Sequence, residues 1–155
     1  MSEVFLFALP RYLERRTRRF THPALCALTI GLAPPAWSET ITGPITTIRD
    51  VDTIVVGQTP VRLNGVDGPE RNTAVGREAR RWMIDHVGGK ILSCVLNGDR
   101  SHDRLVGICY AEGRDIGAVA IAAGYALDCP RFSRGRYRGL ETKQAKAKIS
   151  RAPYC

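Results

Sequence analysis

The chain of 155 residues is 44% hydrophobic and 25% charged, which is the composition of an ordinary soluble globular protein with room for one domain. It contains no internal repeat, low-complexity segment or linker to a second domain. The formal net charge of +8 at pH 7 favours polyanionic partners such as nucleic acid, whereas it says little about the fold.

The first 38 residues have the pattern of an export signal. Five arginines lie between residues 11 and 19, an apolar run follows over residues 23–34, and Ala36-Trp37-Ser38 offers small residues to a signal peptidase. The apolar run is shorter than the roughly 20 residues that span a bilayer. We therefore expect a signal peptide over residues 1–38, a domain over residues 39–155, and a secreted or periplasmic protein. The alternative is a basic tail on a cytosolic protein.

The domain itself predicts short strands interrupted by helices. Residues 41–49 alternate weakly and predict a strand that residues 53–56 continue, and a polar turn then returns the chain along residues 61–63. Residues 74–87 change to a helical period, with Thr73 as the N-cap. The expected later elements are a strand at 90–96, a turn at 97–99, a strand at 105–110, a helix from a cap at 115 through 123, a basic loop at 130–139 and a last helix at 140–149.

The cysteines predict two disulfides. Four remain once Cys26 leaves with the leader, and an even number in an exported chain fits an oxidising compartment. Four cysteines allow three pairings. We expect Cys94–Cys109 across a hairpin, which leaves Cys129–Cys155 to tie the last residue to the domain. No Cys-x-x-Cys occurs and the histidines lack ligand spacing, which argues against a structural zinc site.

An acidic motif with one arginine carries the chemistry. Asp50 and Asp52 lie at i and i+2, which places both on one face of a strand. Asp67 and Glu70 bracket a Gly-Pro turn, and Arg62 lies between the two acidic pairs. Carboxylates bind hard cations, a glutamate can act as a general base, and arginine grips phosphate. This set suits metal-assisted hydrolysis of a phosphodiester.

In order and spacing these residues resemble the thermonuclease family of staphylococcal-nuclease-like domains. The matching elements run from about residue 41 to 144: Asp50-Val51-Asp52-Thr53, Arg62-Leu63, Asp67-Gly68-Pro69-Glu70 and Arg104. The resemblance implies an α+β, mainly β fold: a five-stranded Greek-key barrel of the oligonucleotide/oligosaccharide-binding (OB) type with about three helices. The spacing of the elements alone indicates only α+β.

The resemblance also implies roles for the motif residues. Asp52, Asp67 and the carbonyl of Gly68 would hold one Ca²⁺, and Asp50 would lie behind them, holding water or orienting the turn. Glu70 would position or deprotonate the attacking water. Arg62 would bind a phosphate oxygen and stabilise the charge that develops during attack.

Three positions depart from the family pattern. The second catalytic arginine is expected in a longer turn, so Arg104 matches either an earlier basic residue or the catalytic arginine itself; we favour the second register, which keeps the later elements in spacing. Val51 replaces a glycine, which is harmless only if the backbone there is extended. Gly68 replaces a threonine or alanine, and only its carbonyl is needed.

A basic segment with two aromatic residues could bind the substrate. Phe132, Arg134, Arg136 and Tyr137 belong to this segment and are expected to follow the phosphate backbone and stack on a base. The alternative is a solvated loop over the barrel, with Phe132 or Tyr137 inserted in the core.

The sequence therefore predicts an exported, monomeric, Ca²⁺-dependent nuclease, an ester-bond hydrolase that cuts DNA and RNA with little sequence preference. Two other functions stay open. One is a non-catalytic OB-fold module that binds nucleic acid, and the other is a structural or interaction domain held by disulfides.

Overall fold

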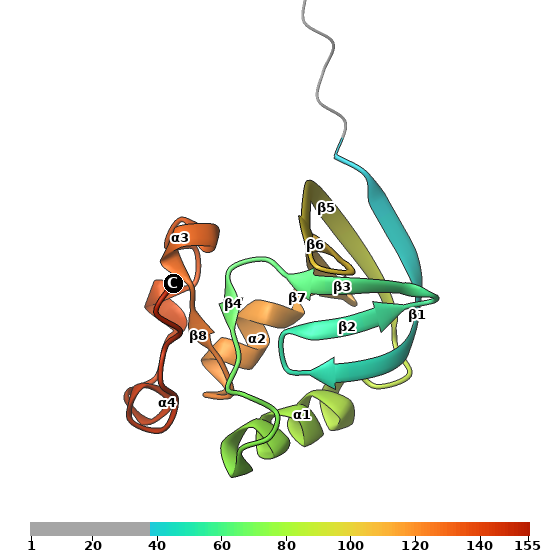
Figure 1. Cartoon of the computed structure of the whole chain (residues 1–155). Coiled ribbons are helices and arrows are strands. Elements are labelled where there is room, and N and C mark those ends of the chain that lie inside the picture. Colours follow the sequence, from blue (N-terminus) through green and yellow to red (C-terminus); the bar gives the residue numbers. More distant parts are fainter. Residues whose placement is uncertain (1–37) are drawn as a thin grey trace, which may run out of the picture. The chain divides into compact units, whose positions relative to one another are not determined.

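The structure is a computed structural model that describes residues 38–155, so the predicted leader lies outside the described residues apart from Ser38. The domain is a small β-barrel flanked by helices (Figure 1). No helix of the described part is long and apolar enough to cross a membrane. The barrel strands are β1 (Thr40–Asp50), β2 (Thr53–Val56), β3 (Thr59–Leu63), β5 (Ile91–Ser101) and β6 (Arg104–Ala111).

The barrel closes because β3 and β6, the two ends of the row β3-β2-β1-β5-β6, pair with each other. Strand β1 pairs antiparallel with both β2 and β5, and the β2–β3 and β5–β6 pairs are also antiparallel. Strands β3 and β6 then pair in parallel, with Arg62 opposite Val106. Closure leaves no open sheet edge in this ring. The predicted α+β class with an OB-like barrel is confirmed.

Two helices begin at the predicted caps. Helix α1 (Ala74–Val87) starts after Thr73, whose Oγ1 accepts a 3.0 Å hydrogen bond from the Gly76 backbone N–H. Helix α2 (Ile116–Ala122) starts after Asp115, which accepts from the Ala118 N–H at 3.0 Å. Figure 1 shows α1 lying across one end of the barrel.

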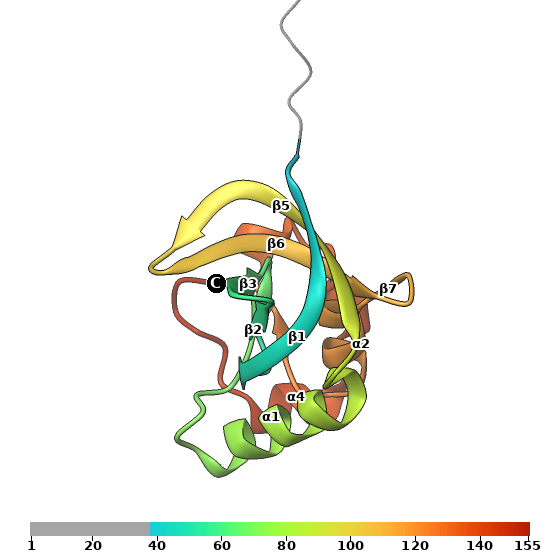
Figure 2. The ribbon, with the colours of Figure 1, turned by 90° about the vertical axis from the view of Figure 1, so that its right-hand side faces the viewer.

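Two turns differ from the prediction. Residues 53–56 do not continue the first strand, because the chain reverses at Val51 and Asp52 and β2 runs back along β1. The β5–β6 hairpin turns at His102 and Asp103, beyond the predicted turn at 97–99. The Asn-Gly-Asp stretch forms a bulge within β5, in which Gly98 takes a φ of 85°. Figure 2 shows this hairpin projecting from the barrel.

The C-terminal part is more broken than predicted. The basic loop contains a short helix, α3 (Pro130–Ser133), and a 3₁₀ turn, η1 (Arg138–Leu140). The last helix is only α4 (Lys143–Lys148), because Glu141 is extended and the Thr142 hydroxyl caps the Ala145 N–H. Two-residue strands complete the fold: β4 (Val66–Asp67), β7 (Arg114–Asp115) and β8 (Leu127–Asp128).

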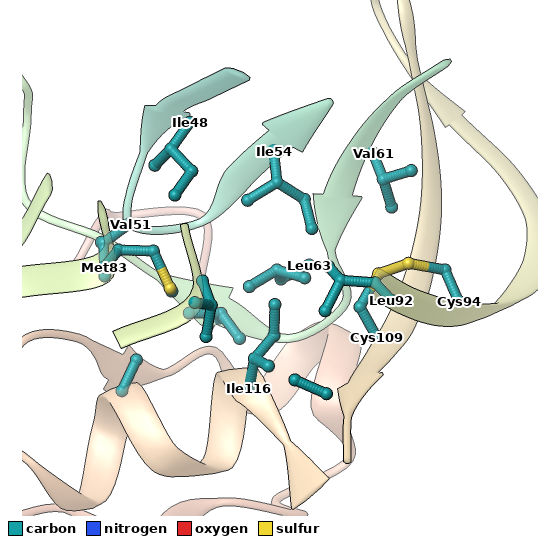
Figure 3. Close-up of a cluster of buried hydrophobic side chains, with 14 of the residues drawn as sticks. Ile48, Val51, Ile54, Val61, Leu63, Met83, Leu92, Cys94, Cys109 and Ile116 are labelled. Atoms are coloured by element: carbon teal, nitrogen blue, oxygen red, sulfur yellow. A yellow bond between two sulfur atoms is a disulfide. The ribbon is translucent and has the colours of Figure 1, made fainter. Parts of the chain in front are cut away.

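The core fills the barrel and the space between it and the two longer helices (Figure 3). Ile54 and Leu63 point inward from the strands and meet Met83 of α1 and Ile116 of α2. The Cys94–Cys109 disulfide links directly opposed residues of β5 and β6, and a second disulfide joins Cys129 to Cys155. The structure thus contains both predicted pairs.

Candidate functional site

The β1–β2 turn places two carboxylates at one end of the barrel. Asp52 is 4% exposed; its Oδ1 accepts from the Thr53 hydroxyl at 2.9 Å and its Oδ2 accepts from the Gly68 backbone N–H at 3.1 Å. Asp50 is only half-buried, and its Oδ1 accepts from the Asp52 N–H at 3.3 Å. The two aspartates therefore belong to a tight turn and not to one face of a strand.

Two arginines approach this turn from neighbouring strands. Arg62 on β3 lies opposite Thr53, and its Nη1 is 2.9 Å from Asp52 Oδ2. Arg104, the first residue of β6, donates through Nη1 to the Thr53 hydroxyl at 3.0 Å. Its Nη2 and Nε bond the Ser101 hydroxyl and carbonyl at 2.9 and 3.1 Å, so the guanidinium is fixed. Arg62 thus contacts Asp52 directly, whereas the Thr53 hydroxyl links Arg104 to the same carboxylate.

Asp67 and Glu70 come from β4 and the segment that follows it. Asp67 ends β4, is 3% exposed, and accepts through Oδ2 from the Ala152 backbone N–H at 2.8 Å. Burial raises the pKa of Asp67 above its usual value, and the charge of Glu70 adds to the rise, while the Ala152 N–H and the charge of Arg62 oppose it. Glu70 itself is exposed at the rim. The charge of Arg62 thus acts on both Asp52 and Asp67, and the charge of Glu70 acts on Asp67.

Burial also makes the ionised form of the Asp52 carboxyl less favourable. Desolvation is the main cause that raises the pKa of Asp52 to about 7, and the neighbouring Asp50 carboxyl adds to it. Arg62 and the Thr53 hydroxyl oppose the rise. Burial therefore outweighs the charge of Arg62, and a bound cation would favour the ionised form of this carboxyl.

The departures at positions 51 and 68 compensate each other. Val51 does not take a positive φ, so its β-branched side chain causes no backbone strain, and it is 1% exposed. A Cβ added to Gly68 would lie 2.5 Å from Val51 Cγ1 and 3.1 Å from Asp52 Oδ2. The valine side chain therefore occupies the space that a side chain at position 68 would need.

The described residues contain no group of three or more His, Cys, Asp or Glu side chains that could hold a metal ion. The predicted pair of Asp52 and Asp67 is smaller than such a group. A cation bound there would draw its other ligands from the Gly68 carbonyl, water and a substrate phosphate. All of these are hard oxygen donors, the type that Ca²⁺ takes.

The predicted substrate-binding segment divides into buried and exposed members. Tyr137 is 2% exposed and its hydroxyl donates to Asp115 Oδ2 at 2.9 Å, so its ring is not available to stack on a base and that prediction is wrong. Arg136 pairs with the same carboxylate, 3.5 Å from Asp115 Oδ2. Phe132 and Arg134 are exposed, and Phe132 lines the main cleft of the domain.

That cleft has a volume of about 520 Å³, and none of the predicted acids is among the residues that line it. Arg62 and Arg104 form part of its wall, together with Arg100 and Tyr154. Arg100 and Tyr154 are not among the site residues predicted from the sequence. The aromatic residue next to a terminal cysteine was a usable signal for Tyr154, because a disulfide returns that residue to the domain. For Arg100 there was no such signal, because the predicted turn placed it outside the strand.

Comparison with known proteins finds similarity to staphylococcal-nuclease-like proteins. The model of the family described as "Staphylococcal nuclease homologue" matches residues 60–152, more than half of the chain. The chain is 32% identical over 66 residues to "Staphylococcal-like nuclease CAN1" of Arabidopsis thaliana, and 33% identical over 66 residues to "Uncharacterized 38.1 kDa protein" of Capnoides sempervirens. Each alignment covers 43% of this chain and only 20% of the relative. Asp50 and Asp52 precede the family match, while Arg62, Asp67 and Arg104 lie within it.

Proposed function

This chain belongs to the family of staphylococcal nuclease homologues, and from that premise we propose that it hydrolyses phosphodiester bonds of DNA and RNA with Ca²⁺ as cofactor. One observation carries the proposal: Asp52 accepts from both Arg62 and the Gly68 N–H, and Thr53 connects this pair to Arg104. Buried charged groups cost desolvation free energy, and perturbed carboxyls with a specific charged partner are found most often at functional sites.

Arg62 and Arg104 bind and orient the phosphate. Both line the cleft, and both are held by polar partners, so the donors are already aimed before the substrate arrives. A guanidinium presents a planar fork of N–H groups to a phosphate, which a lysine ammonium does not. Donors fixed in advance stabilise developing negative charge without reorganisation during the reaction.

Asp52, Asp67 and the Gly68 carbonyl hold the cation, and Asp50 orients the turn behind them. The support is the donor chemistry: all of these groups offer oxygen, and Asp52 and Asp67 are buried carboxyls whose ionised form a cation would favour. When bound, Ca²⁺ supplies positive charge for the substrate phosphate and for water. Glu70, exposed at the rim beside Asp67, positions the attacking water and accepts its proton.

The substrate is contacted mainly through its phosphates, so sequence preference is low. Residues 1–38 hold five arginines and two glutamates, so residues 39–155 keep a formal charge of +5, which supports attraction of a polyanion. We further propose that residues 1–38 direct export to the periplasm or the exterior, and that the domain of residues 39–155 acts as a monomer. The two disulfides support an oxidising compartment.

The test is digestion of single-stranded DNA and RNA by the oxidised protein, with Ca²⁺ and with a chelator. Glu70→Gln should abolish Ca²⁺-dependent cleavage. Glu78→Gln is the matched control, since Glu78 is an exposed glutamate on α1 away from the cluster. Salt-sensitive binding without cleavage by the folded wild type would instead support the non-catalytic module.

A further inference from the structure

Two exposed aromatic side chains meet at the mouth of the cleft. Phe132 is 49% exposed and Tyr154 is 52% exposed, and their ring centroids lie 6.4 Å apart at 60°. The other large hydrophobic residues exposed in the described part are aliphatic. Both aromatic residues line the cleft that contains Arg62 and Arg104. An exposed aromatic pair beside two phosphate-binding arginines requires an explanation, because solvent exposure of rings gains nothing for folding.

One disulfide holds both rings in place. Phe132 belongs to α3, which begins after Cys129, and its N–H donates to the Cys129 carbonyl at 3.0 Å. Tyr154 precedes Cys155, the disulfide partner of Cys129, and a turn bond from the Cys155 N–H to the Ala152 carbonyl, 3.0 Å long, orients it. Tyr154 lies beyond residues 60–152, so its place at the cleft comes from this chain's own C-terminal segment and not from the family match.

The charge around the rings suits a nucleotide. Arg62, Arg100 and Arg104 line the cleft against a single acid, Asp99. The Arg131 guanidinium lies 5.5 Å from the centroid of the Phe132 ring, and Phe132 is still 49% exposed. Positive groups that follow a backbone and rings that offer a π-face are the two components of single-strand binding.

We propose that Phe132 and Tyr154 form an aromatic platform on which an unpaired nucleobase stacks while Arg62 and Arg104 hold its phosphate. In a duplex both faces of a base are already stacked, so the platform serves single strands and frayed ends. This inference rests on the proposed nuclease function for its substrate class, and adds to it two aromatic residues that contact the base, one of them beyond the family match.

The test measures equilibrium binding of a short single-stranded DNA in chelator, by fluorescence anisotropy. Phe132→Ala and Tyr154→Ala should each raise the Kd on the order of tenfold, because stacking on an aromatic ring contributes that much per base. Tyr154→Phe should bind as the wild type does. The same strand with abasic sites should bind more weakly and should be insensitive to Tyr154→Ala. Leu140→Ala, which removes an exposed side chain outside the cleft, is the control.

The outcomes separate the platform from the nuclease. If the wild type cleaves DNA but both alanine variants bind single strands as tightly as the wild type, the platform is refuted and the nuclease stands. If the wild type cleaves nothing, yet the alanine variants lose affinity for the base-bearing strand alone, the nuclease fails and the platform stands. If the alanine variants lost as much affinity for duplex and abasic DNA as for the base-bearing single strand, the platform would also be refuted. Such a result would show a general loss of electrostatic attraction or of folding.

Discussion

The exchange of side chains between positions 51 and 68 makes a prediction that the structure quantifies. Gly68→Ala would place a methyl group 2.5 Å from Val51 Cγ1, well inside van der Waals contact. Overpacking of this kind costs about 1–3 kcal/mol of unfolding free energy. Val51→Ala removes two buried methyl groups and should cost at least about 1.6 kcal/mol, from about 0.8 kcal/mol for each buried group.

The double variant should be more stable than the sum of the two changes predicts. Without Val51 Cγ1 the new methyl at position 68 has room, so we expect a favourable coupling of about 1–2 kcal/mol. Urea unfolding at constant m-value measures it. Val56→Ala combined with Gly68→Ala is the control, since Val56 is buried against Gly43 elsewhere in the barrel, and this pair should be additive.

The cycle also reports on the site, because the Gly68 N–H donates to Asp52 Oδ2. We expect Gly68→Ala to slow cleavage and the double variant to recover part of the rate. Effects of Val51→Ala and Gly68→Ala on stability that add to within about 0.5 kcal/mol would refute the claim that the two positions share one space.

Three further predictions concern the cation, acid stability and the first disulfide. Ca²⁺ at about 100 times its Kd should stabilise the wild type by about 2.7 kcal/mol in thermal melts, and Asp67→Asn should remove most of this gain. Glu141→Gln should make the free energy of unfolding depend less on pH in acid. Burial alone would raise the pKa of Glu141, but the hydrogen bonds that it accepts from Lys146, Arg151 and the Asp128 N–H lower it. The stability that Glu141 contributes is therefore present above its unfolded-state pKa of about 4.3 and is lost as pH falls through the lower folded-state value, which melting curves in acid would follow. Replacing both Cys94 and Cys109 by serine should cost about 3 kcal/mol in urea unfolding, given their separation of 15 residues; a loss under about 1 kcal/mol would contradict the loop-closure account.

The sequence could predict those features that depend on local pattern. The caps at Thr73 and Asp115 and the helix over residues 74–87 follow from neighbouring residues and are present in the structure. The pairing of Cys94 with Cys109 follows from two successive strands that form a hairpin, although the hairpin turns later than predicted. Spacing also predicted Arg62 near Asp52, because β3, which carries Arg62, pairs with β2, which begins directly after Asp52.

Features that depend on long-range packing could not be predicted. The parallel pairing of β3 with β6, which closes the barrel, has no local signature. The Asn-Gly-Asp bulge in β5 has the residues of a turn, and only its pairing with β6 distinguishes the two. The burial of Tyr137 depends on Asp115, which is 22 residues away in the chain, so an exposed aromatic loop was an equally good prediction.

The most direct test of the account is the single-turnover cleavage rate of Arg62→Ala and Arg62→Lys on single-stranded DNA with Ca²⁺. Arg62→Lys keeps a positive charge beside the buried Asp52. We therefore expect its melting temperature to be close to that of the wild type, which would show that the fold is retained. Arg77→Ala is the control, since Arg77 is an exposed arginine on α1. The account predicts that Arg62→Ala lowers the rate on the order of a hundredfold or more. We also expect the cleavage rate of Arg62→Lys to stay well below that of the wild type and the rate of Arg77→Ala to equal the wild-type rate. Near-normal turnover in both Arg62 variants would contradict the assignment of the cluster as the catalytic site.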